Sequence, residues 1–198
     1  MAEEKKTVQV PIGMRTSTYY PIDAEPDDSH PTYKNAVDMG AAVKGYLSIT
    51  TASAEIRGDD VTQLQTDSFV SGQLDVETTL SDLEVNSTIY GHTYTEQDGE
   101  VSSGDDQSPN GGYSFIEPIL RKDKSVVYRA SVFPKVSATA SGEKQEADTK
   151  PSGDLNPKMN AVIFTVMEDN KGTWRQRKDF DTEKAASDWI ASFFGQTG

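Results

Sequence analysis

Hydrophobic and polar side chains alternate along much of the chain, which is the pattern of a β-strand with one buried face. The stretch 69–77 shows this clearly, because Leu74 and Val76 fall on one face and polar side chains fall on the other. It lies within the longer stretch 61–91, which reads as a strand, a turn, a second strand and a short helix.

The short helix predicted after this strand is the element around which the other elements must pack. Capping-box spacing that begins at Ser81 predicts its start, and Gly91 predicts its end. Its apolar side consists of Leu83, Ile89 and Tyr90. A helix cannot bury such a side alone, so the flanking sequence is expected to supply sheet faces.

Further strands are predicted on both sides of this helix. The segments 43–49 and 53–57 alternate in polarity and are followed by the turn composition of 58–60. The segments 113–120 and 126–134 are predicted to form a hairpin, because a short polar turn separates them.

The last part of the chain is predicted to hold an apolar strand and a closing helix. Residues 160–168 are apolar on both faces, which indicates either a central strand or one that is buried by assembly. The strand 174–180 has a basic outer edge, and the helix 183–194 follows it, capped by Asp181 or Thr182. We therefore predict a mainly β fold: a β-sandwich or partial barrel with a flanking α-helix and a C-terminal helix.

We predict one domain, residues 36–198, with an N-terminal arm, residues 1–35. Prolines break up the arm, so it is expected to form at most short strands, at 8–10 and 18–20, and no core element. Long polar loops are predicted at 95–112 and 137–157. The arm is either a mobile terminus or a segment that folds along a neighbouring subunit. Disordered tails are poor in aromatic residues, so the second interpretation is favoured by Tyr19, Tyr20, Ile22 and Tyr33.

The charge balance disfavours ordinary nucleic-acid binding. The chain has 19 Lys and Arg residues against 32 Asp and Glu residues, a net charge of −13. Such a protein does not neutralise phosphates. Loop 95–112 carries five carboxylates and no basic residue, so it is either a solvated connection or a functional concentration of negative charge.

The sequence predicts no catalytic residues, no metal site and no cofactor, and hence no enzyme. There is no cysteine, which excludes disulfides and Cys-ligated metals. His30 and His92 have no nucleophile or HExxH spacing nearby. The pair Asp59–Asp60 lacks the spacing of a calcium loop, so we interpret it as part of a turn.

The order of several segments resembles that of a known family. These segments are TYKNAVDMGAAVKGYLSI, EIRGDD, FVSGQLDVETTLSDLEVNSTIYG, GGYSFIEPI, VVYRASVFPKV and FTVMEDNKGTWRQRKDFDTEKAASDWI. Together they are similar to the major tail proteins, the tail-tube subunits of long-tailed, non-contractile bacteriophages, in particular those of phages and prophages of Gram-positive bacteria. The resemblance covers residues 14 to 194.

This resemblance implies a structural virion protein with the tail-tube-protein fold. Family members form hexameric rings that stack into the tail tube, the conduit for dsDNA ejection into the host. The implied partners are other copies of the chain, a tape measure protein, and tail terminator and distal tail proteins. The dsDNA passes through the lumen without specific binding, and no membrane is involved. The implied location is the phage tail, assembled in the cytoplasm of the bacterial host.

Three sets of residues are expected to serve this assembly. Asp75 and Glu77 are predicted to face the lumen, where negative charge repels DNA. The arm residues named above are predicted to contact a neighbouring subunit. Ring stacking is assigned to the loop 137–157, through Glu143, Lys144, Glu146, Asp148 and Lys150.

A carbohydrate-binding β-sandwich module is the alternative. Sugar rings stack on exposed aromatic planes, and Trp174 and Tyr113 are the candidates for such a surface.

Overall fold

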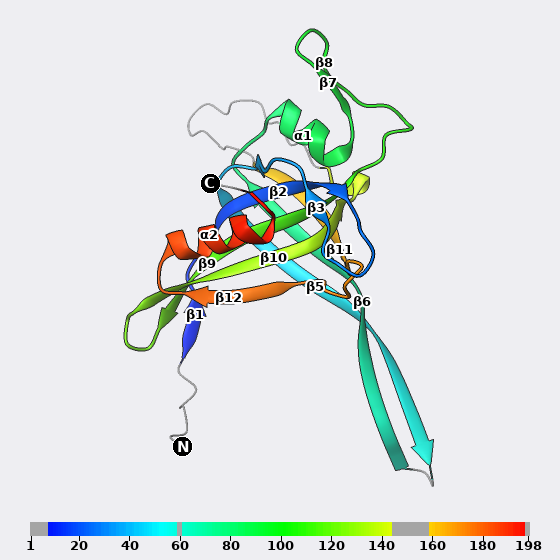
Figure 1. Ribbon diagram of the computed structural model, residues 1–198, viewed down its shortest axis with the longest axis vertical. Helices are drawn as coiled ribbons and strands as arrows, with labels where there is room; N and C mark the ends of the chain where they lie inside the picture. Colours follow the sequence, from blue (N-terminus) through cyan, green and yellow to red (C-terminus); the bar gives the residue numbers. More distant parts are fainter. Residues whose placement is uncertain (1–7, 59–60, 144–158, 197–198) are drawn as a thin grey trace, which may run out of the picture.

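One antiparallel sheet dominates the computed structural model, which describes residues 8–58, 61–143 and 159–196, with backbone alone for 56–58 and 61–65 (Figure 1). The strand order is β3-β2-β9-β10-β11-β6-β5, while β1 pairs with β9, β4 with β2 and β12 with β10. The strands of this sheet are β1 (Gln9–Pro11), β2 (Arg15–Ala24), β3 (Thr32–Tyr33), β4 (Val37–Asp38), β5 (Ala42–Gly58), β6 (Val61–Thr78), β9 (Asn110–Arg121), β10 (Val126–Ala138), β11 (Asn160–Met167) and β12 (Gln176–Phe180). The predicted mainly β fold with two helices is confirmed.

Strand β10 has different partners along its two halves. One edge pairs with β9 throughout, but the other pairs with β12 over Tyr128–Val132 and with β11 over Lys135–Ala138. The change falls at Pro134, where the register with β9 also shifts. Proline has no N–H to donate and occurs in sheets at such irregularities. The sheet therefore forks at this residue.

The larger hydrophobic core lies on one face of the sheet. Strand β11 is central, the first of the two predicted alternatives, because it pairs with both β10 and β6, and its Phe164 stacks on Tyr19 of β2. The predicted burial of Leu74 and Val76 is confirmed, since each is 1% exposed. The other buried residues of this core are Met39, Ile89, Tyr90, Tyr113, Phe133, Val136, Ala138, Val162 and Val166.

Helix α2 (Glu183–Phe193) covers the opposite face of β9, β10 and β12 (Figure 1). Its N-cap is Thr182, whose hydroxyl accepts a hydrogen bond from the N–H of Ala185, so the predicted closing helix is confirmed. Phe194, directly after the helix, stacks on Tyr20 with ring centroids 3.8 Å apart.

Helix α1 (Leu83–Tyr90) confirms the predicted short helix with two corrections. Its N-cap is Asp82 and not Ser81, because the Asp82 carboxylate accepts hydrogen bonds from Glu84 and Val85. Leu83 is 49% exposed although it lies on the same helix face as the buried Ser87 and Tyr90, so the buried face does not extend to the first residue of the helix. Gly91 ends the helix in the left-handed conformation, as expected.

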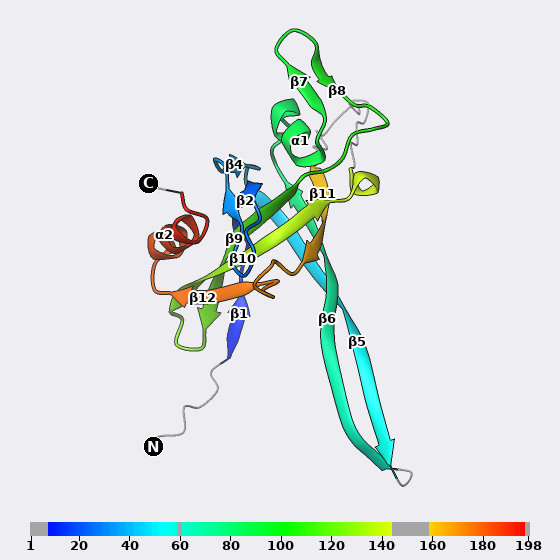
Figure 2. The ribbon, with the colours of Figure 1, turned by 45° about the vertical axis from the view of Figure 1, so that its right-hand side comes forward.

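Strands β5 and β6 form one long hairpin instead of the shorter strands predicted, and the predicted turn 58–60 falls where β5 ends and β6 begins. They are continuous over 17 and 18 residues. Register shifts between Ala42 and Lys44 and between Thr50 and Thr51 take the place of turns. The distal part of the hairpin extends away from the body of the subunit (Figure 2).

The two loops predicted as long and polar differ from one another. The first contains the end of a small hairpin of β7 (Thr93–Thr95) and β8 (Gly99–Val101), and its last residues begin β9. The second begins with the end of β10 and the short 3₁₀ helix η1 (Ala140–Gly142). Residues 144–158 lie outside the described part of the chain.

Candidate assembly surface

The outer edge of β5 is unpaired in the part of the chain that the structure describes, since β5 is the last strand of the sheet. An unpaired edge presents a row of N–H and C=O groups to other chains. Proteins usually protect such edges with charges, prolines or short strands. Residues 42–55 contain no proline, and their only charged residues are Lys44 and Glu55. This edge is therefore suited to pairing.

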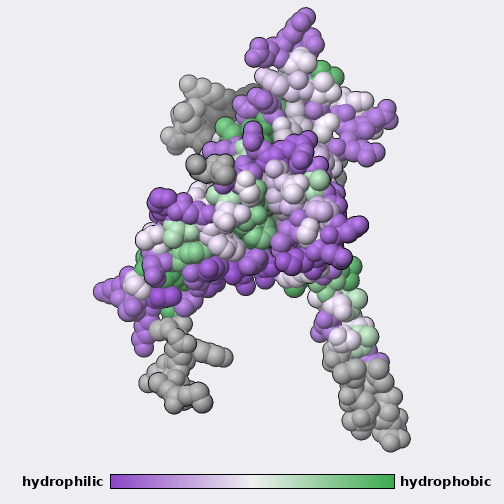
Figure 3. Space-filling view, in the orientation of Figure 1, coloured by the Kyte–Doolittle hydropathy of each residue, from purple (hydrophilic) through white to green (hydrophobic). Residues whose placement is uncertain are grey.

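The part of the hairpin beyond the body is exposed on both faces. Every described side chain in 51–55 and 66–68 is exposed. Apolar Ile49 and Val70, nearer the body, are 52% and 56% exposed. Figure 3 shows hydrophobic residues where the hairpin leaves a largely hydrophilic body. An isolated two-stranded ribbon is marginally stable in water. A partner that packed against the projecting part of the β5–β6 hairpin would bury its exposed side chains.

A groove of about 380 Å³ lies beside the base of the hairpin. Val43 and Lys44 of β5 line it together with residues of β6, β9, β10 and the segments before β2 and β12. Its walls are mainly apolar, with Met14, Leu47 and Phe115 among them. The free edge of β5 and this groove thus form one continuous surface.

Asp75 and Glu77 project from the face of β6 opposite Leu74 and Val76, as the alternation predicted. The amide of Gln73 donates a hydrogen bond to Asp75, with a distance of 2.8 Å. The ammonium group of Lys44 lies 3.6 Å from the carboxylate of Glu77, in an exposed ion pair that solvent screens. The structure brings the two acids onto one face, but Lys44 partly neutralises them.

Strand β12 and its surroundings form a basic surface, in keeping with the basic outer edge predicted for it. Arg129 binds the carboxylate of Asp179 through two nitrogens, at 2.7 and 3.0 Å. Arg175, Arg177 and Lys178 line the same shallow surface. Negative charge is therefore not uniform over the subunit, and only some of its faces repel polyanions.

Most residues assigned to the arm lie within the subunit's own fold. Tyr19 is fully buried and Tyr20 is 5% exposed, one on each face of β2, and the Tyr33 hydroxyl donates to the carbonyl of Pro134. Ile22 is partly buried in β2, opposite Tyr33 of β3. The prediction that 1–35 forms no core element is wrong for β2, because its aromatic residues fill both cores. The possible short strand at 18–20 is part of the longer strand β2, which also contains Pro21.

Of the residues assigned to ring stacking, the structure describes Glu143 alone. Its carboxylate lies 3.4 Å from Nε2 of His92. Lys144, Glu146, Asp148 and Lys150 lie outside the described residues, and their assigned role stays a prediction.

The two aromatic residues named for carbohydrate binding are already in contact with other side chains. Tyr113 is fully buried. The ring of Trp174 stacks on Phe69 with centroids 4.6 Å apart, and the guanidinium of Arg175 lies 4.4 Å from its centroid. Neither residue presents a bare ring face of the kind that sugars require.

The projecting hairpin is the feature that sequence reasoning missed. One signal was present: the chain has no proline between Pro31 and Pro109. Such an interval permits long uninterrupted strands.

No protein-family model matches the chain, and no curated protein matches it in sequence. Among the described residues, neither helix has the length and apolar character needed to cross a membrane.

The burial of Tyr19 predicts how the subunit responds to its loss. Tyr19→Ala should lower the free energy of unfolding by about 3–5 kcal/mol, because it leaves a cavity beside Phe164. It also removes the hydrogen bond from the Tyr19 hydroxyl to Pro109. Tyr46→Ala is the matched control, since Tyr46 is 61% exposed. It should change the free energy of unfolding by less than about 0.5 kcal/mol. Urea unfolding of the monomer measures both, and equal stabilities would contradict the burial of Tyr19.

Proposed function

We propose that this chain is a structural subunit that polymerises as stacked hexameric rings into a bacteriophage tail tube, the conduit for dsDNA. The observation that carries the proposal is the unpaired edge of β5, continued by a hairpin that extends beyond the body. The resemblance of the segment order to that of major tail proteins is the reason for proposing a tail tube in particular.

The open edge supports a repeating contact between subunits. The outer edge of β12 also has no partner among the described strands, and it lies on a different part of the sheet. When two different edges of a subunit meet between copies, the contact is head-to-tail, and such contacts close into rings or continue as filaments. Closing a sheet into a barrel removes its free edges.

The charge of the chain supports passage of DNA without binding. A channel lined with Lys or Arg would bind phosphates through the release of counterions. The net charge of −13 and the placement of Asp75 and Glu77 on one face suit a wall that repels DNA. The basic surface around β12 would then lie away from the channel.

A shortened hairpin tests the assembly directly. Ala52 and Ser68 are register partners, so residues 53–67 can be replaced by Asn-Gly, a sequence that favours a two-residue turn. The purified wild-type chain should form rings or tubes in negative-stain electron microscopy at high concentration. The shortened variant should keep its circular dichroism spectrum and sediment as a monomer, because the described side chains that are removed are all exposed.

A matched pair of substitutions controls for surface charge. Ile49→Lys on the hairpin should raise the protein concentration needed for assembly at least tenfold. Val101→Lys on β8 should not, although the two residues are 52% and 51% exposed. A wild-type chain that is a monodisperse monomer at every concentration would overturn the proposal. Tubes formed by the shortened variant would show that the contact lies elsewhere.

Reversing the charge of the acidic face tests its place in the tube. The double variant Asp75→Lys and Glu77→Lys should still assemble, but its tubes should retain short DNA duplexes at low salt and protect them from nuclease. In a phage, the same variant should slow genome delivery. The control is Glu96→Lys with Asp98→Lys on the β7–β8 hairpin. Any DNA that its tubes bind should lie outside the channel and be degraded by nuclease. Equal nuclease sensitivity in the two variants would exclude these acids from the channel.

A further inference from the structure

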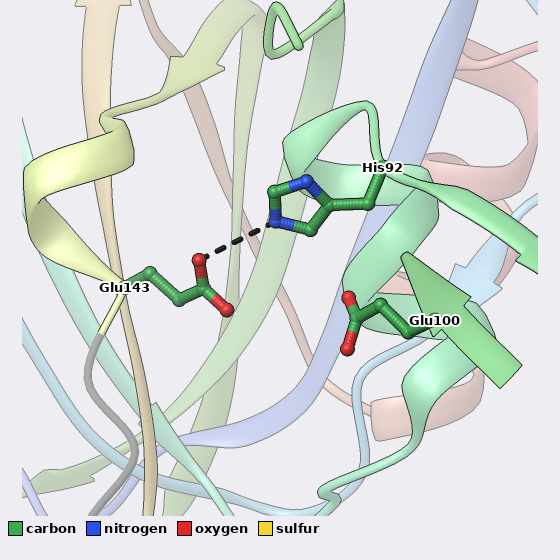
Figure 4. Close-up of side chains that lie close together, drawn as sticks. All are labelled: His92, Glu100 and Glu143. Carbon is green, nitrogen blue, oxygen red and sulfur yellow. Dashed lines mark hydrogen bonds and ion pairs between the residues drawn. The ribbon is translucent and has the colours of Figure 1, made fainter. Parts of the chain in front are cut away.

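His92, Glu100 and Glu143 come together from three separate segments (Figure 4). His92 follows the end of α1, Glu100 lies in β8, and Glu143 follows η1. One ligand atom from each lies within 4.8 Å of those of the other two, and all three residues are partly buried. Nitrogen and carboxylate oxygen atoms are the donors that bind divalent metals such as zinc.

Asp106 fixes the orientation of the His92 ring. Nδ1 of His92 lies 2.8 Å from a carboxylate oxygen of Asp106, which also accepts a hydrogen bond from the N–H of Ser103. A hydrogen bond to this carboxylate holds the proton on Nδ1 and leaves Nε2 facing the two glutamates. Metal-ligating histidines usually have such a carboxylate partner on their second nitrogen.

Buried polar residues of α1 hold the two glutamates. The Asn86 amide lies 3.5 Å from Glu143, and the Ser87 hydroxyl lies 3.3 Å from Glu100. Asn86 and Ser87 are 5% and 4% exposed. Polar side chains are seldom buried so deeply unless they have hydrogen-bond partners, and here the partners include the two glutamates.

Tyr90 supplies an independent observation that points to a ligand. It is 2% exposed, and its hydroxyl has no hydrogen-bond partner among the described residues. Its ring stacks against His92 with centroids 5.9 Å apart. Burial, and secondarily the charge of Glu143, raise the pKa of the Tyr90 phenol. Buried hydroxyls are normally paired, so this one indicates an additional group beside the cluster.

We propose that Nε2 of His92 and the carboxylates of Glu100 and Glu143 bind a divalent transition-metal ion of the Zn²⁺ class. Bonds of about 2.0–2.2 Å place ligand atoms roughly 3–4 Å apart around one ion, so small side-chain rotations close the site. One imidazole with two carboxylates suits Zn²⁺ better than Ca²⁺ or Mg²⁺, which prefer all-oxygen ligands. Three protein ligands leave a position for water.

The ion would join the end of α1, the β7–β8 hairpin and the residue after η1. Since it binds the folded chain, it stabilises that chain. This inference does not depend on the proposed tail tube, because it concerns the subunit alone.

Metal titration of the full-length chain, stripped with EDTA, tests the site. Zn²⁺ at about 100 times its dissociation constant should raise the melting temperature by roughly 5–10 °C, while the same concentrations of Ca²⁺ and Mg²⁺ should not. In calorimetric titrations, Glu100→Gln and Glu143→Gln should each weaken Zn²⁺ binding at least tenfold. Asp106→Asn should weaken it about 10–100-fold through the orientation of His92.

Glu96→Gln is the control, because Glu96 lies in the exposed turn of the β7–β8 hairpin and outside the cluster. It should bind Zn²⁺ as the wild type does. Both glutamine substitutions conserve side-chain shape, and circular dichroism checks that the variants fold. The proposal is wrong if millimolar Zn²⁺ produces neither heat nor a melting shift, or if the glutamine variants at 100 and 143 bind like the wild type.

Discussion

Strand β10 is the constraint on which the rest of the fold depends, because it pairs with three strands instead of two. Its change of partner at Pro134 separates β12 from β11. The branch with β12 is covered by α2, whereas the branch with β11 continues through β6 to β5 and ends in an open edge. Both branches end in an unpaired edge, but only the β12 branch has a face covered by a helix, and the β5 edge is the longer of the two.

This asymmetry has an energetic consequence for the hairpin. Ordering the backbone costs about 1–2 kcal/mol per residue, which buried apolar surface normally offsets. Residues 51–55 and 66–68 bury little against the body. Their order within the isolated chain therefore rests on contacts inside the hairpin, such as the β5–β6 ladder and the hydrogen bond from Ser53 to Asp67. A neighbouring chain that covers the apolar Ile49 and Val70 would supply the missing stabilisation.

Local sequence patterns predicted the elements whose two faces differ. The alternation around Leu74 identified the second half of β6, and the caps of both helices identified α1 and α2 within a few residues. The pattern failed for the hairpin, because a strand exposed on both faces is polar throughout and resembles a turn. It also failed for Tyr19 and Tyr20, which fill opposite cores and therefore show no alternation. The His92 cluster joins residues up to 51 positions apart, a contact that no local pattern contains.

The central idea is that the subunit is incomplete at β5 and is completed by another copy. Hydrogen–deuterium exchange at low and high protein concentration tests it most directly. The amides of 48–55 and 66–72 should exchange rapidly in the dilute subunit and become protected at least tenfold as assemblies form, while those of β9 and β10 stay protected throughout. Equal exchange of the hairpin amides at both concentrations, with assemblies present in the concentrated sample, would contradict it.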